Sequence, residues 1–223
     1  QYLDNPPYEV LSTAWLSYED VLRLKEVEEM VEIYYNSNQF VRTLRLLEQV
    51  CSDAFSIYEG LAGFYREKGL FVQTPSRTYR YQVLYDFCMT TELSKWKELV
   101  QETLTYDLYL RENVKNRPGF IPTVTAQEEA TFKNFSRSFY EQEEKERRML
   151  PDYAQYDSRQ LAKMTHMEFL RYPVWEEAAL SDRKRQPATA AVLFDYRHRD
   201  PLTDDARTVV LEVVEATGRG EKA

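Results

Sequence analysis

The stretch TPSRTYRYQVLYDFC, residues 74 to 88, places two arginines on a helix stripe that should face the core. At about 100° per residue, Arg77 and Arg80 share one helix face with apolar residues at helical spacing. Thr74 as the cap and Pro75 as the first helical residue would put both arginines near the helix N-terminus, where the macrodipole disfavours cations. The stretch therefore predicts an acidic partner, either a carboxylate of this chain or a bound anion.

Carboxylates that could pair with these arginines occur on two other predicted helices. Glu28 falls inside the apolar arc of the first predicted helix, and Glu32 lies at the edge of that arc. Asp107 lies on the apolar side of the fifth predicted helix. Because a buried charge without a partner is costly, one interpretation is an internal ion pair between Arg77 or Arg80 and one of these acids.

The alternative interpretation is a ligand site at the start of the same helix. Ser76, Arg77 and Arg80 would face a cleft and hold a phosphate or carboxylate against the free backbone amides of the helix start. Tyr81 is among the tyrosines that could line such a cleft, although tyrosines at helical spacing are more often core residues. The residues alone leave both interpretations open.

The composition is that of a folded domain. The chain has 223 residues, of which 43% are hydrophobic, so it can bury a sizeable core. A net charge of -8 argues against a nucleic-acid-binding surface. The sequence contains neither an apolar run long enough for a membrane span nor an export signal, so we expect a cytoplasmic protein without a membrane partner. The start at Gln1 suggests a piece of a longer protein.

Residues with reactive side chains are few, and none stands in a catalytic or cofactor-binding pattern. Cys51 and Cys88 are expected to be buried small hydrophobic residues rather than metal ligands. His198 is expected in an exposed turn, His166 lies on a predicted strand, and neither has a nucleophile with an orienting group nearby. We therefore predict no catalytic, cofactor-binding or metal-ligating residue in this chain.

The hydrophobic pattern predicts an α+β fold that is predominantly helical. About six helices form the body, and they are followed by a small three-stranded antiparallel sheet. Ser17 with Asp20, and Thr125 with Glu128, have the spacing of capping boxes. A basic last turn followed by Gly69 predicts the end of the third helix. The expected strands are 166–175, 189–197 and 207–214.

These elements predict four parts of the chain. Residues 1–16 are expected to be an extended linker from an upstream domain, and residues 17–150 the helical body. Residues 151–216 are expected to be a sheet subdomain packed on that body. The tail, 217–223, has no large apolar residue and is expected to be disordered.

Several long and unusual motifs resemble a known group of proteins. The stretch PPYEVLSTAWLSYEDVLRLKEVEEMVEIYYNSNQF, residues 6–40, resembles the segment that follows the catalytic barrel in cobalamin-binding-domain radical SAM proteins, which are Fe-S oxidoreductase-like, and opens their C-terminal domain of unknown function. Three later stretches look like landmarks of the same domain. They are SRTYRYQVLYDF at 76–87, YDLYLREN at 106–113 and VLFDYRHRDPLTDDAR at 192–207.

The resemblance implies a parent radical SAM enzyme whose upstream domains bind cobalamin, S-adenosylmethionine and a [4Fe-4S] cluster through a CxxxCxxC motif. This chain lacks that motif, so no catalytic residue carries over to it. We expect a non-catalytic accessory domain that shapes or covers the substrate site of the barrel in the same polypeptide. The alternative is a helical module that binds a protein partner through exposed aromatic residues.

Overall fold

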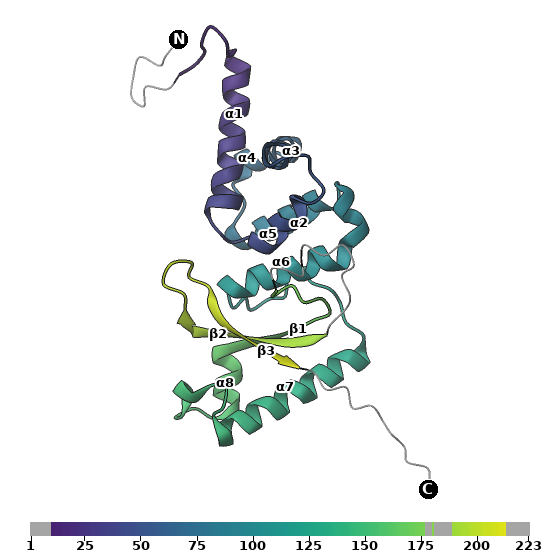
Figure 1. The fold of residues 1–223 in the computed structure, drawn as a ribbon, viewed down its shortest axis with the longest axis vertical. Coiled ribbons are helices and arrows are strands. Elements are labelled where there is room, and N and C mark those ends of the chain that lie inside the picture. Colours follow the sequence, from purple (N-terminus) through teal and green to yellow (C-terminus); the bar gives the residue numbers. More distant parts are fainter. Residues whose placement is uncertain (1–9, 177–179, 181–188, 213–223) are drawn as a thin grey trace. The chain divides into compact units, whose positions relative to one another are not determined.

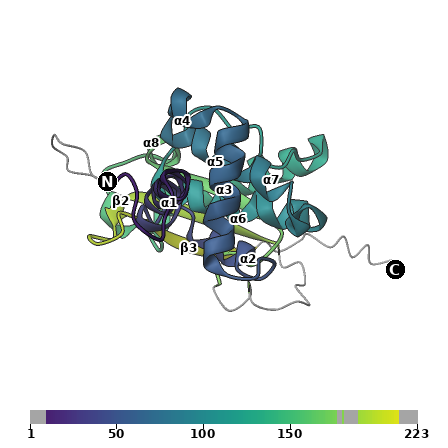
Figure 2. The same ribbon diagram turned by 90° about the horizontal axis from the view of Figure 1, so that it is seen from above.

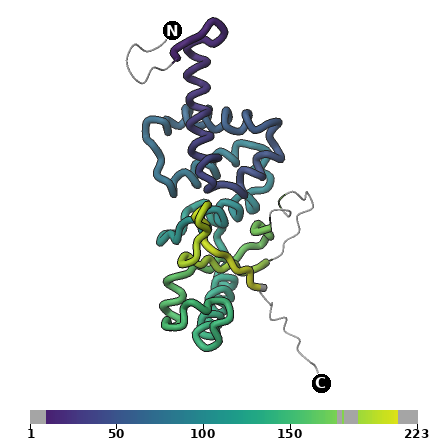
Figure 3. The backbone as a smooth tube through the Cα atoms, turned by 60° about the vertical axis from the view of Figure 1, so that its left-hand side comes forward, coloured from purple at the N-terminus to yellow at the C-terminus, as the bar shows by residue number. Residues whose placement is uncertain are grey.

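The computed structural model describes residues 10–176, 180 and 189–212. They form two compact units, which divide between Val100 and Gln101. Figure 3 follows the chain through both units by colour. The described residues contain eight α-helices and one three-stranded antiparallel sheet, so the predicted α+β, predominantly helical class is confirmed. Residues 1–9 of the expected linker and the expected tail lie outside the described residues.

The first helix of the N-terminal unit begins where the sequence predicts. The hydroxyl of Ser17 accepts a hydrogen bond from the Asp20 backbone N–H at 3.1 Å, and the Asp20 carboxylate accepts one from the Ser17 N–H at 3.0 Å. This capping box starts α1 (Tyr18–Met30). The chain then continues without a break into a π-helical segment, Val31–Asn36. Tyr34 is the buried residue of that segment.

The rest of the N-terminal unit consists of short helices. They are α2 (Val41–Leu47), α3 (Ala54–Glu67), α4 (Leu70–Gln73) and α5 (Arg77–Cys88). Figure 2 looks down on this unit, in which α1 packs against α3. Phe40 lies in the core between the rings of Tyr34 and Tyr81, with centroid distances of 4.9 and 4.5 Å. The one-turn helix α4 is too short to show a periodic pattern, and the sequence did not predict it.

The sequence predicts where α3 ends and which residue caps α5, and the structure tests both predictions. Gly69 has a φ of 67° directly after the last turn of α3, so the predicted stop is confirmed. The predicted cap of α5 was wrong. Thr74 has a φ of 47°, and the cap is Ser76, whose hydroxyl accepts a hydrogen bond from the Tyr79 N–H at 3.3 Å. The helix therefore starts later than predicted, at Arg77.

In the C-terminal unit the helices come first and the strands follow them. A 3₁₀ turn at the end of the N-terminal unit, Glu92–Trp96, leads into α6 (Lys97–Arg111), which belongs to the C-terminal unit from Gln101 on. A capping box of Thr125 and Glu128 starts α7 (Ala126–Glu146) as predicted. A second 3₁₀ turn, Pro151–Tyr153, precedes α8 (Ser158–Met164). The strands are β1 (Thr165–Leu170), β2 (Ala190–Arg199) and β3 (Ala206–Glu212). The missed helix α8 has its own capping box, Asp157 with Gln160, which is visible in the sequence.

The sheet has the order β1-β2-β3, and both pairs are antiparallel. Thr165 pairs with Asp195, and the β2–β3 pairing is irregular between Asp195 and Arg199. The predicted first strand was too long, because the chain leaves the strand after Leu170. The last two residues of the predicted third strand lie outside the described residues.

The sheet of the C-terminal unit is covered on both faces. Figure 1 shows α6 on one face and α7 with α8 on the other. Phe194 of β2 contacts Tyr106 and Tyr109 of α6, with ring centroids 5.6 and 5.9 Å apart. On the opposite face, a buried cluster joins the helices to the sheet. It comprises Tyr140, Leu150, Tyr153, Leu161 and Leu193.

The division into units differs from the expected boundary at residue 150. Helices α6 and α7 belong with the sheet because their aromatic side chains pack on its two faces. The sequence places the strands after the helices, but it does not show which helices supply the covering layers. None of the helices in the described residues combines the length and apolar character required to cross a lipid bilayer.

Buried tyrosines predict a loss of stability at alkaline pH. Burial raises the pKa of Tyr58, Tyr109 and Tyr140 to about 12. In the unfolded chain a tyrosine ionises near pH 10, roughly. The stabilising effect of the neutral phenols is therefore complete below about pH 10 and is lost as the pH rises towards 12.

We expect the free energy of unfolding, measured by urea titration at a series of pH values, to fall across this alkaline window. Tyrosinate absorbance should increase together with the loss of helical circular dichroism. A smooth titration of all tyrosines near their ordinary pKa, with the fold intact, would contradict the buried positions described above.

Candidate functional site

The C-terminal unit contains a cleft of roughly 770 Å³ beside β1. Its walls come from α6, the connection between α6 and α7, the first turns of α7, and β1 with the residues that follow it. The charged residues among its lining are Glu102, Arg117, Glu128, Glu168 and Arg171. Phe132 and Phe169 form an aromatic part of the wall. The cleft therefore combines ion pairs with an apolar surface.

Glu168 is the centre of a polar group on the α6 side of the cleft. Arg117 donates two hydrogen bonds to its carboxylate, at 3.0 and 2.8 Å, and His166 Nε2 lies 3.1 Å from it. Burial alone would raise the pKa of Glu168, but the hydrogen bonds from His166 and Arg117 outweigh it and lower the pKa. The ring of His166 stacks on Tyr109 with centroids 3.7 Å apart. Glu168 is thus held as a carboxylate in a fixed position.

Glu102 of α6 is a buried carboxylate that lines the cleft. The residue is only 3% exposed. Its two carboxylate oxygens each lie 2.9 Å from the backbone N–H nitrogen of Arg171, and one of them also accepts from the Tyr172 N–H at 2.8 Å. These contacts tie the end of β1 to α6. They also explain why the strand stops at Leu170, because the backbone N–H groups of Arg171 and Tyr172 bond to the Glu102 side chain and not to a neighbouring strand.

The α7 side of the cleft is partly aromatic. Phe132 stacks on Phe169 with centroids 3.9 Å apart and an angle of 10° between the rings. Next to this stack, Arg171 donates a hydrogen bond to Glu128 at 2.8 Å. Glu128 also completes the capping box of α7, and its hydrogen bonds with Thr125 and Arg171 lower its pKa. The same residue therefore starts the helix and positions an arginine at the cleft.

The arrangement suits binding and orientation of a ligand. Two guanidinium groups, from Arg117 and Arg171, are each fixed by a carboxylate, and the stacked rings of Phe132 and Phe169 add an aromatic surface to the same cleft. The described residues hold no group of three or more His, Cys, Asp or Glu side chains placed to bind a metal ion. The sequence analysis did not find this cleft, because its residues come from segments that are far apart in the chain.

The two arginines that were predicted to face the core differ in burial. Arg77 is exposed, so the prediction that it faces the core was wrong. It is the first residue of α5 and precedes the buried stripe that begins at Tyr81. Arg80 is partly buried, and its Nε atom is buried without a hydrogen-bond partner in the part of the chain that the structure describes. The Tyr34 hydroxyl donates to the Arg80 carbonyl oxygen at 3.4 Å.

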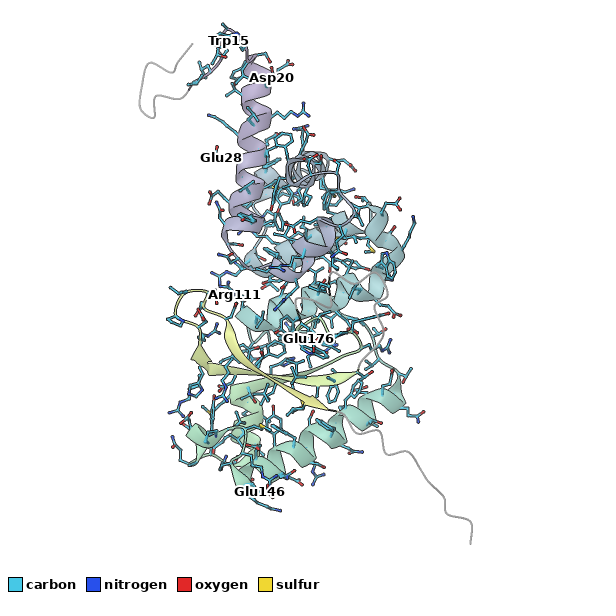
Figure 4. All side chains as sticks on the ribbon, viewed as in Figure 1. Trp15, Asp20, Glu28, Arg111, Glu146 and Glu176 are labelled. Atoms are coloured by element: carbon cyan, nitrogen blue, oxygen red, sulfur yellow. The ribbon has the colours of Figure 1, made fainter. Side chains whose placement is uncertain are left out.

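The predicted inward position of the two glutamates was also wrong. Glu28 and Glu32 are exposed, and Figure 4 places Glu28 on the outer side of α1. The buried stripe of this helix contains Val27, Met30 and Tyr34, and Glu28 lies about 100° away from Val27. The Glu32 carboxylate accepts a hydrogen bond from the Asn36 side chain at 2.6 Å.

Asp107 is buried in the C-terminal unit, whereas the two arginines belong to the N-terminal unit. The Ser76 hydroxyl caps α5 by accepting a hydrogen bond from the Tyr79 N–H, and Tyr81 is a core residue. The ion pairs, and the anion site formed by Ser76, Arg77 and Arg80, stay predictions.

A second polar cluster surrounds Asp195 of β2. This residue is 1% exposed, and its carboxylate accepts hydrogen bonds from the Tyr153 hydroxyl and from the Arg197 N–H, the latter at 3.0 Å. His198 Nδ1 lies 2.7 Å from its second oxygen, and His198 Nε2 lies 3.2 Å from the Asp152 carboxylate. The prediction that His198 is an exposed turn residue was wrong, because β2 extends through it to Arg199. The carboxylate inside the apolar run VLFDY was the available signal.

The prediction that both cysteines are buried is confirmed for Cys88 but not for Cys51. Cys88 is fully buried, and burial raises the pKa of its thiol. Cys51 is partly exposed, and both are free thiols. A buried thiol of this kind is inert towards nucleophilic chemistry.

The comparisons with known proteins give a family but no assigned activity. Residues 1–194 match the family described as "Protein of unknown function (DUF4080)". Neither the comparison with curated proteins nor that with solved structures found a match. The match covers most of the chain, including the whole N-terminal unit, α6, α7 and the first two strands up to Phe194. The chain therefore belongs to the DUF4080 family of proteins of unknown function.

Proposed function

We propose that this chain is a non-catalytic C-terminal accessory domain of a B12-dependent radical SAM enzyme of the cytoplasm, where it shapes or covers the substrate site of the catalytic barrel. The observation that carries the proposal is the resemblance of residues 6–40, and of three later stretches, to the domain that follows the barrel in such enzymes. A single family model matches residues 1–194, and this range contains the resembling stretch 6–40 and the stretches 76–87 and 106–113. The match therefore supports the assignment of these stretches to one conserved unit.

The residues of this chain do not fit the iron-sulfur cluster of the proposed parent. The CxxxCxxC motif supplies three thiolates, and the whole sequence has two cysteines, Cys51 and Cys88. In the structure, Cys88 is fully buried as a thiol in the core of the N-terminal unit. No step of the radical reaction is therefore assigned to this chain. The cluster, S-adenosylmethionine and cobalamin belong to the upstream domains in this proposal.

The cleft in the C-terminal unit is the surface best suited to contact a substrate. It offers fixed guanidinium groups from Arg117 and Arg171 and the stacked rings of Phe132 and Phe169. Such groups orient a ligand, which is the contribution expected of an accessory domain. The barrel would supply the reactive centre, and the cleft would hold the remote part of the substrate.

The proposal is tested in the full-length parent protein. The coding sequence upstream of Gln1 should contain a CxxxCxxC motif, and the purified parent should cleave S-adenosylmethionine when reduced. We expect Arg117→Gln to lower the amount of substrate-derived product formed per deoxyadenosine released, because the substrate is held less well. Lys133→Ala changes an exposed residue of α7 and is the matched control. An upstream sequence without the motif, or an unchanged product ratio, contradicts the proposal.

A second candidate function is a helical module that binds a protein partner. Trp15 is 92% exposed, and Tyr18 and Leu22 follow it at helical spacing with 53% and 43% exposure. Figure 4 shows Trp15 next to the N-terminal end of α1. Exposed aromatic residues at such spacing are typical of surfaces that anchor a partner. On this alternative, Trp15→Ser releases a bound partner, while Arg117→Gln has no effect on any product ratio.

A further inference from the structure

The cleft follows the free edge of β1 and is not confined to one face of the sheet. Four consecutive residues line it, the last three of β1 and Arg171 after them. Neighbouring side chains of a strand point to opposite faces. One cavity can therefore reach all four residues where it passes around the sheet at the C-terminal end of β1, and Thr189, directly before β2, lines it there as well. Within the described residues, β1 is an outer strand that pairs with β2 alone.

An outer strand presents backbone groups that another extended chain can use. In antiparallel pairing, alternate residues direct their N–H and C=O groups to one neighbour, and the residues between them direct theirs to the other side. β1 is in continuous register with β2 from Thr165 to Leu170. The backbone N–H and C=O groups of β1 that do not bond to β2 therefore point away from β2, to the free edge of the sheet. The volume of roughly 770 Å³ is within the usual range for a bound ligand.

The two sides of this edge differ in chemistry. Side chains on the α6 side include Glu168 with its partner Arg117, and those on the α7 side include Phe169 with Phe132. An extended segment lying beside β1 would also alternate its side chains between these two sides. The cleft therefore favours a polar residue next to an apolar one.

The arginine is the more exposed partner in each of the two ion pairs at the cleft. The side chain of Arg117 is 46% exposed and that of Glu168 8%, whereas Arg171 and Glu128 are 40% and 34% exposed. Glu102 is buried. The guanidinium group of Arg117 is therefore the charge that is most accessible to an incoming ligand on the α6 side. Guanidinium groups bind carboxylates well because their N–H donors are arranged in a planar fork.

We propose that the free edge of β1 binds an extended peptide segment of a partner protein, which adds a fourth strand to the sheet. The backbone of the segment hydrogen-bonds to β1. One side chain, aromatic or large and aliphatic, lies against the Phe132–Phe169 stack, and the neighbouring side chain, which is acidic, points towards Arg117. The inference deepens the proposed function, since it names the class of ligand for the same cleft, but its test needs no radical chemistry.

The test is selection of short random peptides displayed on phage against the intact chain. We expect enriched peptides to place an acidic residue next to an aromatic or aliphatic one. A selected peptide, acetylated and amidated at its ends, is then measured by fluorescence anisotropy. N-methylation of every second backbone amide should abolish binding in one register and leave it nearly unchanged in the other, because only one set of N–H groups faces β1.

Variants of the chain locate the peptide. We expect Phe132→Ala to weaken binding by about tenfold or more. Phe135→Ala is the matched control. Phe135 lies on the same helix, and its ring centroid is 5.6 Å from that of Phe169, but Phe135 does not line the cleft. Arg117→Gln should weaken acidic peptides more than their glutamine analogues.

Three results would overturn the proposal: no enrichment of any sequence, equal affinity for the wild-type chain and Phe132→Ala, or binding that ignores N-methylation in both registers. The methylated peptides leave the protein unchanged, so they test the idea even where a variant folds poorly. Failure here leaves the upstream CxxxCxxC motif and the product ratio as separate tests of the accessory role.

Discussion

Replacing Asp195 with alanine is expected to lower the free energy of unfolding of the chain by about 3–5 kcal/mol. Asp195 is 1% exposed, and its carboxylate pairs with the Tyr153 hydroxyl, the Arg197 N–H and His198 Nδ1. Without it, the phenol of Tyr153, which is fully buried, loses its acceptor and keeps its desolvation cost. Urea titration followed by circular dichroism measures the loss.

Two further variants show how much of the stability loss in Asp195→Ala comes from the contacts of the Asp195 carboxylate. Asp152→Ala removes the other carboxylate beside His198, but that side chain is 57% exposed, so we expect a loss of less than about 1 kcal/mol. Asp195→Asn keeps the shape and one acceptor oxygen and should lie between the two alanine variants. If Asp195→Ala cost no more than Asp152→Ala, the cluster around Asp195 would not be the fixed buried group described here.

Local features of the fold were predictable because their signals lie within a few residues. The capping boxes at Ser17 and Thr125 need only a hydroxyl and an acid three positions later, and the structure contains both. The glycine stop at Gly69 is equally local. The change to β-rich sequence after α7 predicted a three-stranded antiparallel sheet, which the structure contains. These elements are decided by short-range hydrogen bonding and by hydrophobic period.

The buried stripe of α1 is narrower than the apolar arc that the sequence predicts. Val27, Met30 and Tyr34 are buried, and at 100° per residue they lie within about 60° of one another. Glu28 lies about 100° from Val27 and is exposed, and Glu32, expected at the edge of the arc, is exposed as well. Apolar residues outside the stripe, such as Leu24 and Tyr35, are also exposed. The spread of apolar residues along this stretch therefore made the predicted arc too wide.

The candidate cleft and the cluster around Asp195 were missed because both depend on tertiary contacts. Tyr153 and Asp195 are 42 positions apart in the sequence, and Glu102 and Arg171 are 69 apart. Helical and strand periods describe each segment separately and do not show which segments meet. What the sequence did offer was a set of polar residues in apolar runs, such as Glu168 and Asp195. Such residues are reasonable candidates whenever a structure is absent, because burying them requires partners.

Glu102→Ala is expected to lower the free energy of unfolding by about 2–4 kcal/mol, because two backbone N–H groups lose their acceptor and a cavity replaces a buried side chain. The carboxylate accepts from Arg171 and Tyr172 at 2.8 to 2.9 Å. Hydrogen exchange gives a second readout. The amides of Arg171 and Tyr172 should exchange faster in the variant, while those of β2 keep their protection relative to global unfolding.

Glu102→Gln separates the hydrogen bonds of this side chain from its packing. The amide fills the same space and keeps one acceptor oxygen, so we expect a smaller loss of stability and protection of one of the two backbone amides. Because Glu102 fixes the end of β1 beside Arg171, peptide binding at the β1 edge should also weaken in Glu102→Ala. Unchanged exchange at both amides in Glu102→Ala would mean that the end of β1 is held by other contacts, and that this wall of the cleft does not depend on α6.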